Sequence, residues 1–126
     1  MKKLITSLIL VSFLILSLPS YTDSYIKPPE VPKMSIDELI SLNAIKYHVS
    51  SKTLHSVIKC ESGYNELAIG DSGQSYGLVQ IHLPSNKTIT KTQAFNPEFA
   101  IEFLAKGLST GRGNAWTCFR SIRSIM

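Results

Sequence analysis

The stretch Leu54-His55-Ser56-Val57-Ile58-Lys59-Cys60-Glu61-Ser62-Gly63 places a carboxylate where a helix should be apolar. If the stretch is a helix, Leu54, Val57 and Glu61 share one face, because residues three or four apart are neighbours on a helix. Ser62-Gly63 is typical of a helix stop, which puts Glu61 in the last turn. An apolar lining and the negative end of the helix dipole both raise the pKa of a carboxyl group. The sequence therefore predicts that Glu61 is an acid that holds its proton.

Helical patterns continue upstream of this stretch. Ser50 is expected to cap the helix of Glu61, which then runs from about Ser51 to Glu61. Before it, Ser35-Ile36-Asp37-Glu38 fits a capping box and opens a helix that ends near His48. That helix is expected to bury a broad apolar face formed by Ile36, Leu39, Ile40, Leu42 and Ile45.

A further helix is expected after residue 95. Asn96-Pro97 is typical of a helix start with proline at the first helical position. Gly107 and the stretch Gly111 to Gly113 are expected to break this helix, and residues 115–120 to pack back as a short helix or turn. The core face of the helix is expected to comprise Phe99, Ala100, Phe103 and Leu104.

The segment between residues 64 and 82 lacks a clear period. Residues 64–76 are rich in turn formers and predict a loop. Residues 77–82 are short and apolar, so periodicity does not settle whether they form strand or helix. Because strand-forming runs are scarce, the fold class is expected to be mostly α.

The N-terminal residues are typical of an export signal. Lys2-Lys3 precede an apolar run from Leu4 to Leu18, which is shorter than the roughly 20 residues that a membrane-spanning helix prefers. We expect a signal peptide or uncleaved anchor at 1–20, a Pro-rich linker at 21–34 and one domain at 35–126. Without the two lysines the formal net charge falls from +4 to +2. No basic stripe interleaved with aromatic residues appears, so nucleic acid is not an expected partner.

Two cysteines, Cys60 and Cys118, lie in the part expected to be exported, where oxidation is permitted. A disulfide between them would close a loop of about 58 residues and stabilise the fold by roughly 4 kcal/mol in the chain-entropy model. It would also tie the helix end that carries Glu61 to the C-terminal segment. A nucleophilic cysteine is the alternative, although neither residue has a motif that suggests a histidine partner.

Three motifs, taken in order, resemble the lytic transglycosylase SLT domain of the lysozyme-like superfamily. They are Cys60-Glu61-Ser62-Gly63-Tyr64-Asn65, then Ser75-Tyr76-Gly77-Leu78-Val79-Gln80-Ile81, then Asn96-Pro97-Glu98-Phe99-Ala100. The similarity covers about Ile40 to Leu108. It implies a lysozyme-like fold that cleaves the MurNAc-GlcNAc bond of peptidoglycan, with Glu61 as the catalytic residue and no metal or organic cofactor.

The chemistry fits this resemblance. Glycosidic cleavage needs a carboxylic acid that is still protonated near neutral pH. In the transglycosylase reaction that the resemblance implies, Glu61 acts as acid and then as base, and the product carries a 1,6-anhydro-MurNAc end. A lysozyme-like hydrolase would need a second carboxylate or a positioned water, and Asp71 is the candidate carboxylate. Asp71 is otherwise expected to form a turn. A wall-binding module without activity is a third reading.

Four further residues are candidates for substrate binding. The Gln80 amide suits sugar hydroxyls or an N-acetyl group, or it ties the loop backbone. Ser62 orients Glu61 or ends its helix. Ser75 and Tyr76 precede a turn at Gly77, and the Tyr76 ring stacks on a sugar or fills the core.

The remaining residues set limits on the interpretation. The histidines have no metal-binding spacing, so no metal site is expected. Trp116 is expected to be a core anchor beside the disulfide, and His82 a surface residue. The A-Y-N-A-G segment of larger transglycosylases is absent, so the cleft is expected to be truncated. We expect an exported monomer located in the periplasm, the cell envelope or the extracellular space. Its expected partner is the glycan strand of peptidoglycan, and secretion or envelope machinery is a further possible partner. Contact with a membrane is expected only through an uncleaved N-terminal segment.

Overall fold

The structure, a computed structural model, describes residues 30–124 of the chain. The chain divides into two units, residues 1–31 and 32–126, and the second contains every helix and strand of the described range. The expected signal segment at 1–20 and most of the expected linker at 21–34 lie outside the described residues. Within residues 30–124, none of the helices has the length and apolar character needed to span a bilayer.

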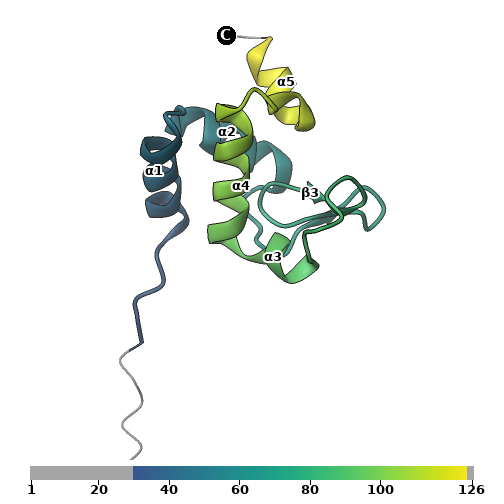
Figure 1. Ribbon diagram of the computed structural model, residues 1–126, viewed down its shortest axis with the longest axis horizontal. Helices are drawn as coiled ribbons and strands as arrows, with labels where there is room; N and C mark the ends of the chain where they lie inside the picture. Colours follow the sequence, from purple (N-terminus) through teal and green to yellow (C-terminus); the bar gives the residue numbers. More distant parts are fainter. Residues whose placement is uncertain (1–29, 125–126) are drawn as a thin grey trace, which may run out of the picture. The chain divides into compact units, whose positions relative to one another are not determined.

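Helices form most of the second unit, and a small antiparallel sheet follows the second helix (Figure 1). The strands have two residues each and lie in the order β1-β2-β3, with Ile69 opposite Tyr76 and Ser75 opposite His82. The mostly helical fold class is confirmed, whereas the sheet falls in the segment expected to be loop or left undecided. In chain order the elements are α1 (Ile36–Tyr47), α2 (Ser51–Ser62), β1 (Ile69–Gly70), β2 (Ser75–Tyr76), β3 (Ile81–His82), the 3-10 helix η1 (Leu83–Ser85), α3 (Lys91–Phe95), α4 (Pro97–Ser109), the 3-10 helix η2 (Gly113–Ala115) and α5 (Thr117–Arg123).

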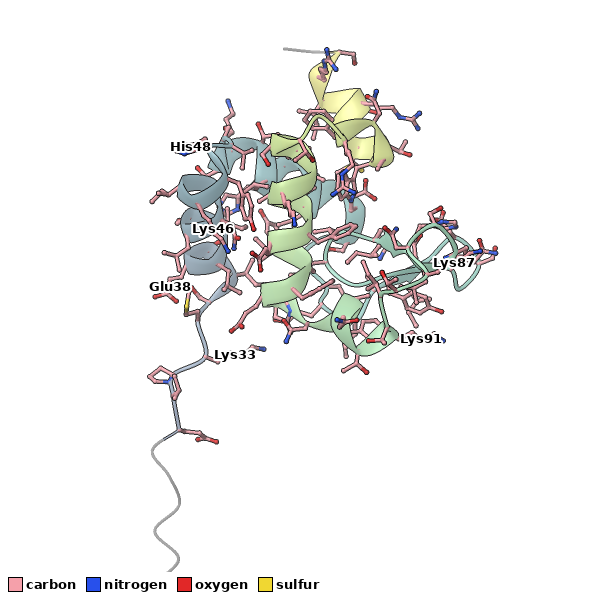
Figure 2. The ribbon with its side chains drawn as sticks, viewed as in Figure 1. Lys33, Glu38, Lys46, His48, Lys87 and Lys91 are labelled. Carbon is pink, nitrogen blue, oxygen red and sulfur yellow. A yellow bond between two sulfur atoms is a disulfide. The ribbon has the colours of Figure 1, made fainter. Side chains whose placement is uncertain are left out.

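The core lies where α4 meets α1 and α2. Lys46 of α1 (Figure 2) also pairs with Glu102 of α4 at 2.6 Å, although exposed ion pairs of this kind add little stability. Burial of apolar side chains is therefore what holds the helices together. The buried apolar residues are Leu39, Ile40, Leu54, Val57, Ile58, Tyr76, Leu78, Val79, Ile81, Ala94, Ala100, Ile101, Leu104, Ala105 and Trp116.

The apolar face of α1 is narrower than the sequence predicts. Ile40 is buried, but Leu42 is 54% exposed and Ile45 is 73% exposed. At 3.6 residues per turn these two positions lie on the side of the helix opposite Ile40. Asn43 is buried instead, and its amide donates to the Leu39 carbonyl at 2.9 Å, which satisfies the polar group. The expectation that Leu42 and Ile45 are core residues is wrong.

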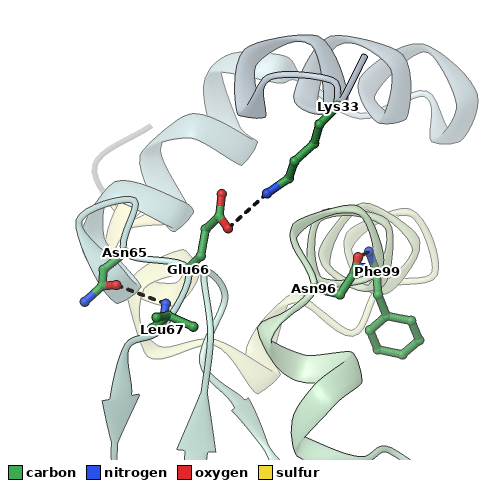
Figure 3. Close-up of polar contacts among 6 residues, drawn as sticks. All are labelled: Lys33, Asn65, Glu66, Leu67, Asn96 and Phe99. Atoms are coloured by element: carbon green, nitrogen blue, oxygen red, sulfur yellow. Dashed lines mark hydrogen bonds and ion pairs between the residues drawn. The ribbon is translucent and has the colours of Figure 1, made fainter. Parts of the chain in front are cut away.

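The predicted helix starts are confirmed. Ser35 forms the capping box of α1, and the Ser50 side chain accepts the backbone N–H of the third helical residue of α2. Asn96 caps α4, where its side chain accepts the N–H of Phe99 at 2.9 Å (Figure 3). The chain before α1 is tied to the loop after α2 by an ion pair between Lys33 and Glu66 at 3.4 Å, also drawn in Figure 3.

Gly107 does not break α4, which continues to Ser109. A Cβ at Gly107 would lie 2.5 Å from the ring of Trp116, so the glycine allows the ring to pack directly on the helix backbone. The chain turns away after Ser109 and the C-cap Thr110, at Gly111, whose φ of +77° is the left-handed conformation that suits glycine. The break predicted at Gly111 is confirmed. The break predicted at Gly107 is wrong, because this glycine lies within the helix and packs against Trp116.

Candidate active site

A cavity of about 590 Å³ lies between the end of α2, the sheet and the segment before α5. Two features of the chain position this cavity. The helix stop after Glu61 turns the chain into the sheet, and η2 leads the chain back beside α2. The lining residues are Glu61, Asp71, Ser75, Gln80, Ile81, His82, Ser85, Asn86, Phe103, Arg112, Ala115, Trp116 and Thr117.

Glu61 lies in the last turn of α2, as the sequence predicts. The helix ends at Gly63, which has a φ of +60° and donates its N–H to the Lys59 carbonyl at 3.0 Å. The Glu61 side chain is half-buried, and its carboxylate accepts the backbone N–H of Cys118 at 3.2 Å. The carboxyl group therefore has one fixed hydrogen-bond donor and faces the cavity.

The pKa of Glu61 is raised above its ordinary value. Burial is the largest cause, because the ionised form loses hydration. The Cys118 N–H lowers the pKa, since it stabilises the carboxylate, and the charge of Asp71 raises it again. Glu61 is thus an acid biased toward its protonated form, in the direction that the sequence predicts.

Cys60 and Cys118 form a disulfide, which confirms the predicted pairing. Cys60 directly precedes Glu61, and Cys118 is the residue whose N–H binds the Glu61 carboxylate. The same covalent bond thus joins α2 to α5 and holds the acid beside its hydrogen-bond donor. It also fixes the residues before Cys118, including Trp116 and Thr117, as one wall of the cavity.

Asp71 lies in the tight turn between β1 and β2, with a φ of +49°. The turn is closed by the N–H of Gly73, which donates to the Gly70 carbonyl at 3.0 Å. The Asp71 carboxylate accepts the hydroxyl of Ser75, which is almost fully buried. The side chain also lines the cavity. Asp71 therefore occupies a turn, as expected, and still brings a second carboxylate to the cavity of Glu61.

Gln80 and Ser75 line the cavity beside these two acids. The Gln80 amide donates to the carbonyls of Gly77 at 3.0 Å and Ala68 at 3.3 Å. Gly70 makes room for it, because a Cβ there would lie 2.3 Å from the amide oxygen. Gln80 therefore braces the loop backbone and faces the cavity at once, so the two roles considered for it are compatible.

A family model described as the transglycosylase SLT domain matches residues 38–119. This chain belongs to that family. No significant match was found among curated proteins or among solved structures. The matched region contains Glu61, the sheet, α4 and the disulfide, and so includes the whole lining of the cavity.

Two residues that the sequence nominated for substrate binding lie off the lining of the SLT domain cavity. The Ser62 hydroxyl donates to the Ile58 carbonyl at 3.2 Å, as a residue ending a helix does. The Tyr76 ring is buried edge-on against Phe95, and its hydroxyl donates to the Gly73 carbonyl. These positions match the helix-ending and core alternatives of the sequence analysis.

The SLT domain cavity also contains residues that sequence reasoning did not assign to it. Trp116 is buried as expected, with its indole N–H donating to the Val79 carbonyl at 2.9 Å, and it forms part of the wall as well. His82 bonds Ser85 at 2.8 Å and the Gln74 side chain at 3.1 Å. Arg112 also lines the cavity, and the sequence analysis gave it no role. The glycines at 111 and 113 on either side of it were the available signal that its backbone has a special position.

Among the described residues of the SLT domain, no group of three or more His, Cys, Asp or Glu side chains could hold a metal ion.

Proposed function

We propose that this SLT domain is a peptidoglycan lytic transglycosylase that cleaves the bond between N-acetylmuramic acid and N-acetylglucosamine. The observation that carries the proposal is Glu61, half-buried on the cavity lining, where burial raises its pKa and biases the group toward its protonated form. Cleavage begins with proton transfer to the bridging oxygen, which requires a carboxyl group still protonated near neutral pH. A fully solvated glutamate would have lost that proton.

In the proposed reaction, Glu61 donates its proton to the bridging oxygen while the bond from that oxygen to C1 of the muramyl sugar breaks. The N-acetyl group of the substrate stabilises the positive charge that develops at C1. The Glu61 carboxylate then accepts the proton of the muramyl C6 hydroxyl as its oxygen bonds to C1. Glu61 regains its proton, the product carries a 1,6-anhydro end, and no water is consumed.

Gln80 is the residue that we assign to substrate binding beside Glu61. Its amide nitrogen is already bonded to the loop backbone, so its position is fixed before substrate arrives. A fixed amide can discriminate among sugar hydroxyls at little further entropic cost. Ser75 acts through Asp71 in this proposal, because its hydroxyl is bonded to that carboxylate.

A hydrolase of the same bond is the second candidate, because Asp71 lines the same cavity and its charge influences Glu61. Asp71 or a bound water would then complete the reaction and leave a reducing sugar end. A binding module without activity is a weaker candidate, since binding alone gives no reason for an acid with a raised pKa in the cavity.

Mass spectrometry of peptidoglycan sacculi digested with the protein tests all three candidates. A transglycosylase releases anhydro-muropeptides, a hydrolase releases the same fragments heavier by one water, and a binding module releases nothing soluble. The Glu61→Gln variant is the matched control, because it keeps the side-chain shape and removes the proton. Hydrated products from the wild type would replace the transglycosylase proposal with the hydrolase.

We also propose that the enzyme works outside the cytoplasm. The Cys60–Cys118 disulfide supports this, because disulfides persist in oxidising compartments. The A-Y-N-A-G segment of larger transglycosylases is absent from the sequence, so a partner that extends the groove fits the proposal. Thiol labelling of protein recovered from the envelope tests the location, because protein kept in the cytoplasm would show two free thiols.

A further inference from the structure

Arg112 is the only permanent cation among the residues that line the cavity of the described chain. The other ionisable groups on the lining are Glu61, Asp71 and His82. The lysines labelled in Figure 2 lie elsewhere, on the α1 side or beyond the sheet. The proposed active site therefore has two acids on its wall and one arginine.

The backbone of Arg112 is held by the end of α4. With Gly111 in the left-handed conformation, the Arg112 N–H donates to the Gly107 carbonyl at 2.8 Å and the Gly111 N–H to the Leu108 carbonyl at 3.1 Å. This pair of bonds is the Schellman arrangement, which closes a helix in one geometry. The Arg112 carbonyl in turn accepts the N–H of Ala115 at 3.0 Å. Both backbone groups of Arg112 are thus fixed, so its side chain starts from a defined point on the cavity lining.

The guanidinium of Arg112 has spare hydrogen-bonding capacity. Its Nε donates to the Thr110 hydroxyl at 3.4 Å, and within residues 30–124 no carboxylate forms an ion pair with it. A guanidinium has five N–H donors in a planar fork. Arg112 is also not among the groups that shift the pKa of Glu61. The remaining N–H donors of Arg112 are therefore available to another group.

A carboxylate is the group that this arrangement suits. An arginine fork binds a carboxylate through two parallel hydrogen bonds, whereas a neutral sugar hydroxyl uses one donor. The charge of Asp71 on the same lining would repel an anionic ligand, and the Arg112 cation on that lining offsets the repulsion. Peptidoglycan strands carry carboxylates either on the stem peptide or, where the peptide has been removed, on the lactyl group of the muramyl sugar.

We propose that Arg112 is a specificity-determining residue that binds a carboxylate of the glycan strand, so that the enzyme prefers carboxylate-bearing strands over neutral ones. This inference rests on the proposed function, which supplies the glycan. It adds the chemical feature by which the strand is chosen, and it assigns that choice to a residue other than the proposed proton donor.

The test compares three soluble strands of equal length. The first carries stem peptides, the second has been stripped by an amidase and exposes lactyl carboxylates, and the third is the stripped strand with those carboxylates converted to amides. The variants are Arg112→Gln, which removes the charge, and Arg112→Lys, which keeps the charge without the fork. Arg123→Gln is the matched control, since Arg123 is an exposed arginine of α5 off the cavity lining.

Arg112→Gln is expected to lower kcat/KM about 10- to 100-fold on the carboxylate-bearing strand that Arg112 recognises, chiefly through KM, as for loss of a charge-assisted hydrogen bond. Cleavage of the amidated strand should stay unchanged, and Arg112→Lys should fall in between. A loss confined to the peptide strand identifies the stem carboxylates, and a loss confined to the stripped strand identifies the lactyl group. Equal losses on all three strands, or no loss on any, as for Arg123→Gln, would overturn the proposal.

Equilibrium binding of the same strands in a Glu61→Gln background separates this inference from the proposed function. If the wild type cleaves no strand, the function fails, yet a preference for carboxylate-bearing strands that disappears with Arg112→Gln still supports the inference. If cleavage occurs and all three strands bind equally well with or without Arg112, the function stands and the inference is wrong.

Discussion

The last turn of α2 and the turn between β1 and β2 each bring a carboxylate to the same cavity, in opposite surroundings. Glu61 is half-buried at a helix end with a single backbone N–H, and burial raises its pKa. Asp71 is exposed in a tight turn and accepts the hydroxyl of Ser75. The same chemical group therefore behaves differently in the two places: burial biases Glu61 toward its protonated form, and the charge of Asp71 adds to that bias.

Removing the acid from α2 is the strongest way to test this difference. Glu61→Gln should lower the release of soluble muropeptides by about 10²- to 10⁴-fold, the usual contribution of a general acid. The glutamine keeps nearly the same volume, so the fold should persist. Matching circular dichroism and thermal melts are the control for folding. A folded variant with substantial activity would mean that Glu61 is not the proton donor.

Removing the Cys60–Cys118 disulfide tests how the Glu61 carboxyl group is held beside the Cys118 N–H. The Cys60→Ser, Cys118→Ser double variant should lose about 4 kcal/mol of unfolding free energy, the chain-entropy value for a loop of this length, as measured by urea titration. Because α5 then loses its covalent link to α2, activity should also fall at temperatures where the variant is still folded. A reducing agent should reproduce both effects in the wild type and leave the double variant unchanged. Full activity in the reduced wild type would show that α5 holds its place without the disulfide.

Features that depend on a few neighbouring residues could be predicted from the sequence. The caps at Ser35, Ser50 and Asn96 were predictable because each side chain bonds a backbone N–H within three residues. The environment of Glu61 was predictable for the same reason, since helix periodicity alone places it on the apolar face. The short helix α3 has an equally local signal, the capping box between Thr90 and Gln93, and sequence reasoning overlooked it.

Features that depend on distant contacts could not be predicted. The strands have two residues each, too short for an alternating pattern, and they pair residues that a turn-rich segment separates. The exposure of Ile45 and the fit of Gly107 against Trp116 depend on which helices pack together. Arg112 reaches the cavity only because α4 ends where it does. The proposed acid could thus be predicted from the sequence, whereas most of the cavity wall around it depends on the tertiary fold.

Removing the charge of Asp71 in the β1–β2 turn tests the second carboxylate of the cavity. Asp71→Asn should reduce kcat/KM by less than about tenfold, well below the roughly 10²- to 10⁴-fold expected for a general acid, because the Asp71 charge only biases the protonation of Glu61. Activity falls as pH rises through the pKa of Glu61, and loss of the Asp71 charge lowers that pKa. The alkaline decline of the pH–rate profile should therefore move to lower pH. A loss as complete as that of Glu61→Gln, together with reducing-end products in the wild type, would assign Asp71 a direct role in hydrolysis.

The smallest expected effect is on stability, and it carries the sign of the shift at Glu61. Because the folded pKa is raised above the unfolded value of about 4.3, the folded state binds more protons and stability falls as pH rises between the two values. Below the unfolded value the group is protonated in both states and imposes no penalty. The Tm of Glu61→Gln should therefore match the wild type at acid pH and exceed it slightly at neutral pH.

In an Asp71→Asn background the Glu61→Gln substitution should raise the Tm by a smaller amount, because part of the pKa shift of Glu61 comes from the Asp71 charge. A double-mutant cycle of the four proteins measures that coupling. A gain of equal size in both backgrounds would mean that the two carboxylates share a cavity without influencing each other.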